Sequence, residues 1–225
     1  MNKISSVILL STLNNELLLL NMSIACTKIT EFLSVCSWPR SLNKLYESFS
    51  KKVELKLNPE TREFIKSKHK HDPMLAGVLI EHIVSNNNEN DASVPESIKR
   101  DLQNATNKVI DSKNVSVKYQ LPFVKQSGKV CINCCADLVE YPLTKRVKCC
   151  NQKTKAIGIT DFKVVKAVDK KYFMQLIVYS AGLYDLGHRV KTLRIIDYLN
   201  GNVHTCKLSL YNHIVIKRFI RSHVF

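Results

Sequence analysis

Two charged residues stand close together in an otherwise apolar segment, AIGITDFKVV at residues 156–165. The segment is typical of a β-strand, so Asp161 and Lys163 share one face with Ile159 and are separated by the backbone of Phe162. Burying a carboxylate and an ammonium in such a strand is costly unless they are paired or bind a metal ion. The pattern therefore predicts either a salt-bridged cross-strand pair at a sheet edge or a metal site.

A second carboxylate, Asp137, lies near the end of the preceding predicted strand, VCINCCADLV, on the face that it shares with Cys131 and Cys135. Two carboxylates on adjacent strands provide the hard oxygen ligands that Mg²⁺ and Mn²⁺ prefer. Lys163 would then orient or deprotonate a water molecule that attacks a phosphodiester. This grouping predicts metal-dependent hydrolysis.

Two predicted helices add further polar side chains. Gly77 and His82 lie in the helix MLAGVLIEHIVS, where an inward-facing histidine is either a third metal ligand or a satisfied core histidine. Gln175 and Tyr179 are four residues apart in the helix predicted over 170–186 and therefore share one face. That face is either part of the site or an ordinary half-buried helix surface.

The elements that must position these residues follow from hydrophobic periodicity and breaker residues. Two short helices flank Pro39, a third begins at Asp72-Pro73, and a fourth begins at Ser93. After residue 114 the period changes to two, which predicts an antiparallel meander of three strands, the helix over 170–186, a hairpin at Asn200-Gly201 and a short basic C-terminal helix. The order indicates an α/β protein with its sheet in the second half.

The domain organisation predicted from these elements is simple. Residues 1–26 form an apolar segment of uncertain status, interrupted at Asn14, Asn15 and Glu16. It contains no run of about 20 apolar residues, so we expect no integral membrane association; a signal peptide or a start at Met22 remain alternatives. Residues 27–225 form one domain, with a helical part at 27–112 and a sheet-containing core at 113–225.

The order of the motifs resembles a known family. Gly77 and His82 in a G-x4-H pattern, Asp137 at a strand end, ITDFK at 159–163 and QLIVY at 175–179 are similar to RecB-like nucleases of the PD-(D/E)XK superfamily, in particular the mitochondrial genome maintenance exonuclease branch. The similarity covers about Thr27 to Leu186. It implies an α/β fold with a restriction-endonuclease-like core, in which helices flank a mixed sheet with an antiparallel meander, and an N-terminal helical extension.

The resemblance also implies roles. His82, Asp137, Asp161 and the Phe162 carbonyl would hold Mg²⁺, with Mn²⁺ as a substitute. Asp137, Asp161 and Lys163 would be catalytic, while Gln175 and Tyr179 would contact or support the nucleic acid. The implied activity is a nuclease, in particular a DNA exonuclease acting at single-stranded ends in replication, repair or recombination.

Two departures from the family pattern leave alternatives open. Cys134 stands where a glycine is usual, and 23 residues separate Asp137 from Asp161, more than in the compact family hairpin. One alternative is a catalytically inactive protein with a nuclease fold that binds nucleic acid. Another is a basic interaction protein in which Asp161 and Lys163 are structural.

The eight cysteines are too sparse and too clustered for a disulfide scaffold, which favours a reducing intracellular compartment. Some relatives hold an iron–sulfur cluster through three cysteines after the Q-x3-Y helix. Only Cys206 follows Tyr179 here, so we expect no such cluster. A zinc site is also not expected, because the spacing of the cysteines at 131, 134, 135, 149 and 150 matches no standard zinc knuckle and better fits free thiols.

The charge favours a polyanionic partner. The chain has 34 Lys and Arg against 19 Asp and Glu, a net charge of +15. Lys145, Arg146 and Lys148 stand in the basic loop TKRVKCCNQKTK, between the strands that carry the two aspartates. We expect these three residues to bind the phosphates of nucleic acid, although such a run is also compatible with a solvated face.

Replacing Lys145, Arg146 and Lys148 together by alanine tests this expectation. Binding releases counterions from the nucleic acid at each phosphate contact, so the variant should release fewer of them. The slope of log affinity against log salt concentration should therefore flatten by about 2–3 units. Fluorescence anisotropy with labelled oligonucleotides over a salt series measures the slope. An unchanged slope would show that these residues do not bind phosphates and belong to a solvated face.

Overall fold

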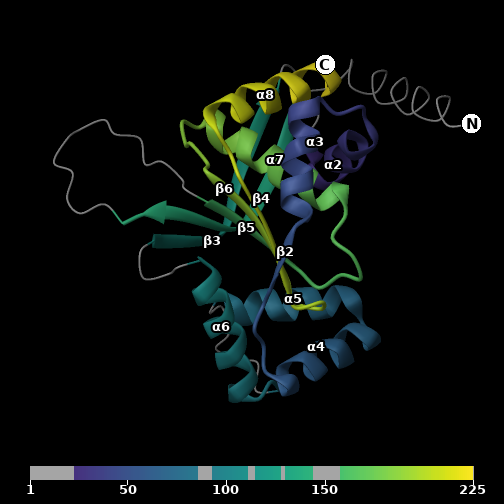
Figure 1. The fold of residues 1–225 in the computed structure, drawn as a ribbon, viewed down its shortest axis with the longest axis vertical. Helices are drawn as coiled ribbons and strands as arrows, with labels where there is room; N and C mark the ends of the chain where they lie inside the picture. The colour runs from purple at the N-terminus through teal and green to yellow at the C-terminus, as the bar shows by residue number, and fades with distance from the viewer. Residues whose placement is uncertain (1–22, 86–92, 111–114, 128–129, 144–157, 225) are drawn as a thin grey trace, which may run out of the picture.

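A computed structural model of the protein describes residues 23–85, 93–110, 115–127, 130–143 and 158–224. Within them the chain forms an α/β fold with one mixed sheet (Figure 1). The elements are, in order, β1 (Ser23–Ala25), α2 (Cys26–Val35), α3 (Arg40–Ser50), β2 (Lys52–Glu54), α4 (Pro59–His71), α5 (Pro73–Val84), α6 (Glu96–Ile110), β3 (Val115–Ser127), β4 (Val130–Pro142), β5 (Gly158–Lys163), α7 (Lys170–Asp185), β6 (Thr192–Asp197), β7 (Asn202–Lys207) and α8 (Leu210–Val224).

The sheet has the strand order β1-β4-β5-β6-β7-β2, with β3 also paired to β4. Strands β3, β4 and β5 are antiparallel neighbours, and so are β6 and β7, which confirms the predicted meander and hairpin. The pair β5–β6 is parallel, and α7 makes the crossover between these two strands. The predicted mixed sheet flanked by helices is therefore confirmed.

Helices cover both faces of the sheet. On one face α2, α3, α7 and α8 form a core with side chains such as Phe49, Ile159 and Phe173. On the other face α4, α5 and α6 form a second core that includes Leu138 and Phe162 (Figure 1). The helical first half of the chain is thus divided between the two faces, and α7 is the most deeply buried helix of the first core.

Local chemistry explains several element boundaries. Asp72 caps α5 by accepting hydrogen bonds from the backbone N–H groups of Met74 and Leu75, as the Asp-Pro pair predicts. Helix α6 begins at Glu96, three residues after the predicted start at Ser93. The reason is Pro95, because the residue before a proline avoids the helical conformation.

Three elements were not predicted, namely β1, β2 and α4. Strands β1 and β2 have only three residues each, too few for a visible alternation. Helix α4 buries only Thr61 and Ile65, so it lacks an apolar stripe. Because β1 pairs with β4 and Cys26 is buried, the fold begins before Thr27.

Some sequence predictions lie outside the described residues. These are the status of residues 1–22 and the basic loop with Lys145, Arg146 and Lys148, together with Cys149 and Cys150. In the described part of the chain, no helix combines the length and apolar character that a membrane span needs.

Gly182 allows α7 to lie against β3. A Cβ atom at this position would stand 2.5 Å from the Phe123 ring and 3.4 Å from Lys125 Cβ. The Phe123 ring in turn packs edge-on against Tyr179, with ring centroids 5.9 Å apart. The close approach therefore fixes the helix that carries Gln175 and Tyr179 against the sheet.

Gly182→Ala should lower the free energy of unfolding. Overpacking costs about 1–3 kcal/mol, which outweighs the ~1 kcal/mol that alanine gains over glycine in a helix. Gly77→Ala is the matched control, because a Cβ there meets nothing within 4 Å and should stabilise α5. Denaturant unfolding measures both, and equal effects of the two substitutions would contradict the packing argument.

Candidate metal site

The predicted acidic residues meet where β4 changes neighbours. One edge of β4 pairs with β1 at residues 131–133 and with β5 at residues 138–140. Asp137 lies between these two ladders, and its carboxylate accepts a hydrogen bond of 2.8 Å from the backbone N–H of Phe162. The site therefore lies at a fork in the sheet, where a carboxylate replaces the next bond of the β4–β5 ladder.

The strands are distorted at this fork. Ala136 and Val139 both contribute to the first core, so the alternation of β4 shifts between them. Between the paired residues Tyr119 and Leu121 of β3, Gln120 is left out of the register with β4 and has a φ of 48°, a left-handed conformation that is uncommon for a residue with a side chain. Strict alternation, as assumed from the sequence, does not hold at Asp137 itself.

Asp161 and Lys163 form an ion pair within β5. Asp161 Oδ2 lies 2.5 Å from Lys163 Nζ, and the exposed fractions of their side chains are 0% and 16%. Ile159 lies in the first core and Phe162 in the second, which confirms that Asp161 and Lys163 share a face. Apart from this ion pair, neither carboxylate oxygen of Asp161 has a hydrogen-bond partner among the described residues.

Burial and like charge act together on the acids. Burial raises the pKa of Asp137 well above its ordinary value, and the negative charge of Asp161 raises it further. Burial opposes the charged form of Lys163, but Asp161 and Asp137 outweigh this effect and raise the pKa of the lysine. Lys163 is therefore an ammonium at neutral pH, and the site favours positive charge.

Of the two adjacent polar residues of α5, Glu81 is half-buried and His82, the predicted ligand, is exposed. Glu81 is half-buried, and its pKa is raised by burial and by the charge of Asp161. Sequence reasoning missed this residue. A signal was present, because Glu81 stands four residues after Gly77 and borders the stripe that ends at Val84.

Gln175 and Tyr179 contact each other as well as sharing a face. The Gln175 amide donates a hydrogen bond of 2.7 Å to the Tyr179 hydroxyl. Tyr179 is buried, and its pKa is raised by this burial and by the negative charge of Asp161. The neutral phenol thus stands close to Asp161, in a position suited to supporting the site rather than contacting a bulky ligand.

Aromatic and basic side chains extend from the site along the start of α7. The ammonium groups of Lys163 and Lys171 lie 5.4 and 4.9 Å from the centroid of the Tyr172 ring. Lys170 lies 5.0 Å from the Trp38 ring, which links this region to the segment between α2 and α3. Such cation–π contacts hold positive charge beside the half-buried rings of Trp38 and Tyr172.

The cysteines of the described part are free thiols. Cys134 is buried and Cys135 is exposed, so these adjacent residues point to different environments. No group of three or more His, Cys, Asp or Glu side chains among the described residues is already arranged to hold a metal ion. The ammonium of Lys163, rather than a converged ligand set, neutralises Asp161.

Comparison with known proteins adds no further assignment. No known family profile matches the sequence, and no curated protein matches it either.

The raised pKa of Asp137 predicts a pH dependence of stability. A carboxyl group whose pKa is higher in the folded state stabilises the fold while protonated, and this contribution is lost as pH rises above about 4. In metal-free buffer, Asp137→Asn should therefore lose less free energy of unfolding than the wild type between pH 4 and 7. The amide oxygen retains the ability to accept the Phe162 N–H.

Urea unfolding at several pH values measures this difference. Glu31→Gln, which removes an exposed carboxylate of α2, is the control and should follow the wild-type curve. Parallel curves for Asp137→Asn and the wild type would show that Asp137 ionises as easily in the fold as in the unfolded chain.

Proposed function

We propose that the protein is a metal-dependent nuclease that hydrolyses phosphodiester bonds of nucleic acid. The observation that carries this proposal is the Asp161 carboxylate, which is fully buried and, among the described residues, has the Lys163 ammonium at Oδ2 and no hydrogen-bond partner at Oδ1. A carboxylate with free lone pairs in the interior is unfavourable without a cation. Lys163 neutralises part of its charge, and a divalent ion would satisfy the remaining oxygen.

The residues at the fork fit Mg²⁺ or Mn²⁺. Asp161 and Asp137 offer carboxylate oxygens there. The family resemblance implies the Phe162 carbonyl and His82 as further ligands, and of these His82 is exposed in the structure. When bound, the ion would act as a Lewis acid that stabilises the charge developing on the phosphate and activates water. The proposed site would hold the cation by exchanging part of the contact between Lys163 and Asp161 for metal ligation.

The protonation state of Lys163 defines its proposed role. Because its pKa is raised, the side chain carries a proton at neutral pH and cannot serve as a base in that form. An ammonium beside the carboxylates can hydrogen-bond the attacking water and stabilise negative charge on the phosphate. The proposed role of Lys163 is thus to position the attacking water and to stabilise negative charge on the phosphate. Asp137 and Asp161 are proposed to hold the ion.

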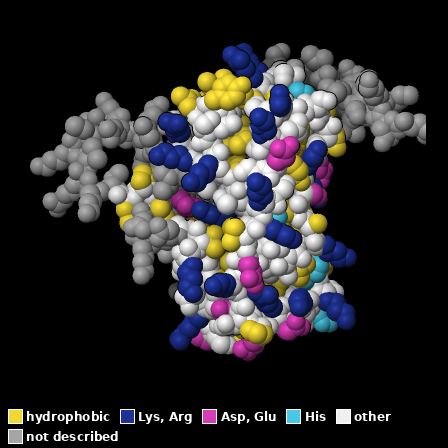
Figure 2. All heavy atoms as spheres, viewed as in Figure 1, with side chains coloured by type: hydrophobic (Ala, Val, Ile, Leu, Met, Phe, Trp, Pro, Cys, Tyr) yellow, Lys and Arg dark blue, Asp and Glu magenta, His cyan; other side chains and the backbone are white. Residues whose placement is uncertain are grey.

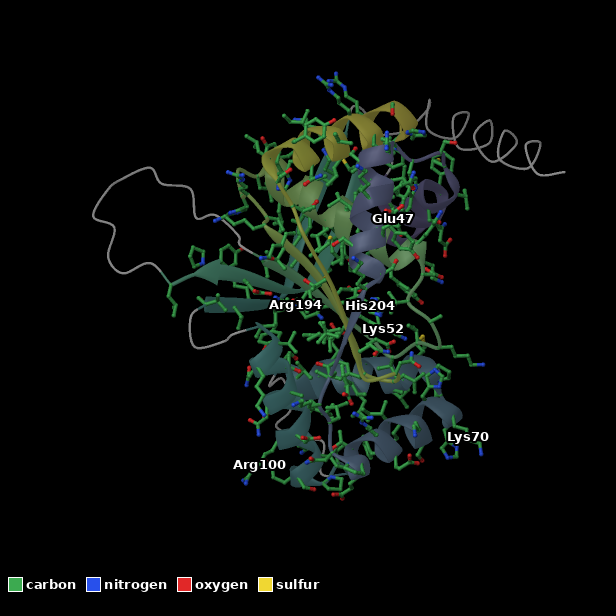
Figure 3. All side chains as sticks on the ribbon, viewed as in Figure 1. Glu47, Lys52, Lys70, Arg100, Arg194 and His204 are labelled. Carbon is green, nitrogen blue, oxygen red and sulfur yellow. The ribbon has the colours of Figure 1, made fainter. Side chains whose placement is uncertain are left out.

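Surface charge supports a nucleic-acid substrate. Separate Lys and Arg side chains are distributed over the face seen in Figure 2, from the α8 end to the end formed by α4–α6, and outnumber the Asp and Glu side chains there. Lys70 and Arg100 project outward from that helical layer, whereas Arg194 comes from the sheet (Figure 3). Nearer the carboxylates, the ammonium groups of Lys163 and Lys171 both lie beside the Tyr172 ring.

The finer assignments rest on the family resemblance together with the topology. The meander β3–β4–β5, the crossover through α7 and the parallel strand β6 support a restriction-endonuclease-like core. DNA with single-stranded ends is the proposed substrate, cut as an exonuclease in replication, repair or recombination. The free thiols support an intracellular, reducing compartment.

One observation favours a second candidate, a nucleic-acid-binding protein with this fold that does not cut. The Lys163–Asp161 ion pair already neutralises the buried carboxylate, and three metal-ligating side chains do not converge in the described part. If that pair is permanent, the basic surface would still bind phosphates.

Asp161→Asn separates the two candidates. The amide keeps the shape of the side chain but removes the charged ligand, so cleavage should fall to the level seen in EDTA while nucleic-acid affinity stays within about twofold. Cleavage and binding are measured on single- and double-stranded DNA and RNA with Mg²⁺, Mn²⁺ or EDTA. Glu60→Gln, an exposed position of α4, is the matched control.

Wild-type cleavage by Asp161→Asn, or full wild-type activity in EDTA, would overturn the metal-dependent proposal. Binding without cleavage by the wild type under every condition would favour the second candidate.

A further inference from the structure

We propose that a surface at the beginning of α7 binds a single strand of nucleic acid beside the carboxylates. This lysine–aromatic surface consists of Trp38, Lys170, Lys171 and Tyr172. Lys170 and Lys171 contact the phosphates next to the one that lies at Asp161. The inference rests on the proposed function, because it takes nucleic acid as the ligand, and it adds contacts that the family resemblance does not imply.

The Tyr172 ring joins this surface to the candidate metal site. The Lys163 ammonium lies 5.4 Å from the centroid of the ring, and the same ammonium lies 2.5 Å from Asp161 Oδ2. The Lys171 ammonium lies 4.9 Å from the same centroid. Because Lys163 and Lys171 lie beside one ring, a strand with a phosphate at Asp161 has its neighbouring phosphates close to Lys171.

A second ring, that of Trp38, lies beside Lys170. The Lys170 ammonium is 5.0 Å from the centroid of the Trp38 ring and 5.9 Å from that of Tyr46. The Trp38 indole N–H donates a hydrogen bond of 2.9 Å to the Leu33 carbonyl, and the indole packs edge-on against Tyr46. The indole is thus fixed in orientation and restricts the lysine side chain, which lowers the conformational entropy that Lys170 loses when it binds an anion.

The charges of these two lysines stay available to a ligand. In the part of the chain that the structure describes, no carboxylate pairs with Lys170 or Lys171. Asp169, which directly precedes them, caps α7 instead by accepting a hydrogen bond of 2.9 Å from the backbone N–H of Lys171. Lys170 is exposed and Lys171 is half-buried, so an anion from outside can reach both.

Two more deeply buried cations of the protein are held differently. The side chain of Lys125 pairs with Asp185, and that of Arg194 pairs with Glu140. Those carboxylates neutralise their partners and give the cations a structural role. An aromatic ring holds a lysine without neutralising it, so the contacts of Lys170 preserve its charge for an external anion.

The combination of lysines and rings fits a single strand of nucleic acid. Each phosphate carries one negative charge, which an ammonium binds as a compact point charge. The half-buried rings of Trp38 and Tyr172 keep part of their surface accessible to the sugars or bases between the phosphates. A duplex keeps its bases stacked inside, so it offers these rings less contact than a single strand does.

Trp38 is the single tryptophan of the chain, so its fluorescence reports directly on this surface. The wild type is titrated with a thymidine oligonucleotide in EDTA, which prevents metal-dependent cleavage. We expect a saturable change in Trp38 fluorescence, with the same Kd that anisotropy of the labelled oligonucleotide gives.

Lys170→Gln combined with Lys171→Gln should raise this Kd about tenfold near physiological salt concentration. Each phosphate contact of a single strand contributes about 0.7 to the slope of log affinity against log salt concentration, so losing two contacts should flatten the slope by about 1.4 units. Lys70→Gln combined with Lys108→Gln removes the same charge from exposed positions of α4 and α6 and should change the Kd less than twofold. Lys170→Arg combined with Lys171→Arg keeps both charges and should bind like the wild type.

The outcomes distinguish this inference from the proposed function. If the oligonucleotide binds without changing Trp38 fluorescence, or if both pairs of glutamines weaken binding equally, the inference fails and the Asp161 site is unaffected. If the wild type binds as expected but never cleaves with Mg²⁺ or Mn²⁺, the inference stands and the nuclease proposal fails. If the wild type binds no nucleic acid, both fail. Phosphatidylserine vesicles that change Trp38 fluorescence and displace the oligonucleotide would assign the surface to an acidic membrane and overturn the inference.

Discussion

The structure depends most on one buried charge, the Asp161 carboxylate at the centre of the sheet. Removing a carboxylate from water costs several kcal/mol, and within the described part of the chain the Lys163 ammonium is the group that compensates it directly. Taking away a single member of a buried ion pair costs about 3–5 kcal/mol, because the remaining charge is left unpaired. The buried charge therefore destabilises the fold relative to a hydrophobic residue at the same position. Binding of a cation would explain why a carboxylate stands there.

The surrounding elements are arranged around this charge. The fork of β4 between β1 and β5 leaves Asp137 free to bond the backbone beside Asp161. Helix α7 brings the buried Tyr179 from one face, fixed by the close approach at Gly182. The site therefore follows from the way in which β4, β5 and α7 pack together, rather than from any one motif.

The sequence predicted what depends on local pattern. Period-two alternation placed Asp161 and Lys163 on one face, Asp72-Pro73 marked the start of α5, and Asn200-Gly201 marked the hairpin. It failed where tertiary structure decides. Helix α4 has no apolar stripe, the alternation of β4 shifts at Asp137, and the orientation of α5 leaves His82 exposed. No local sequence pattern shows which side of α5 faces the sheet.

The central claim is that Asp161 and Asp137 share a divalent cation. Anomalous X-ray diffraction from crystals soaked in Mn²⁺ tests it directly. The account predicts one strong peak within about 2.5 Å of a carboxylate oxygen of Asp161 and close to Asp137, with the Lys163 ammonium moved away from Asp161. An intact Lys163–Asp161 contact with no peak at the fork, at Mn²⁺ concentrations that saturate binding in solution, would contradict it.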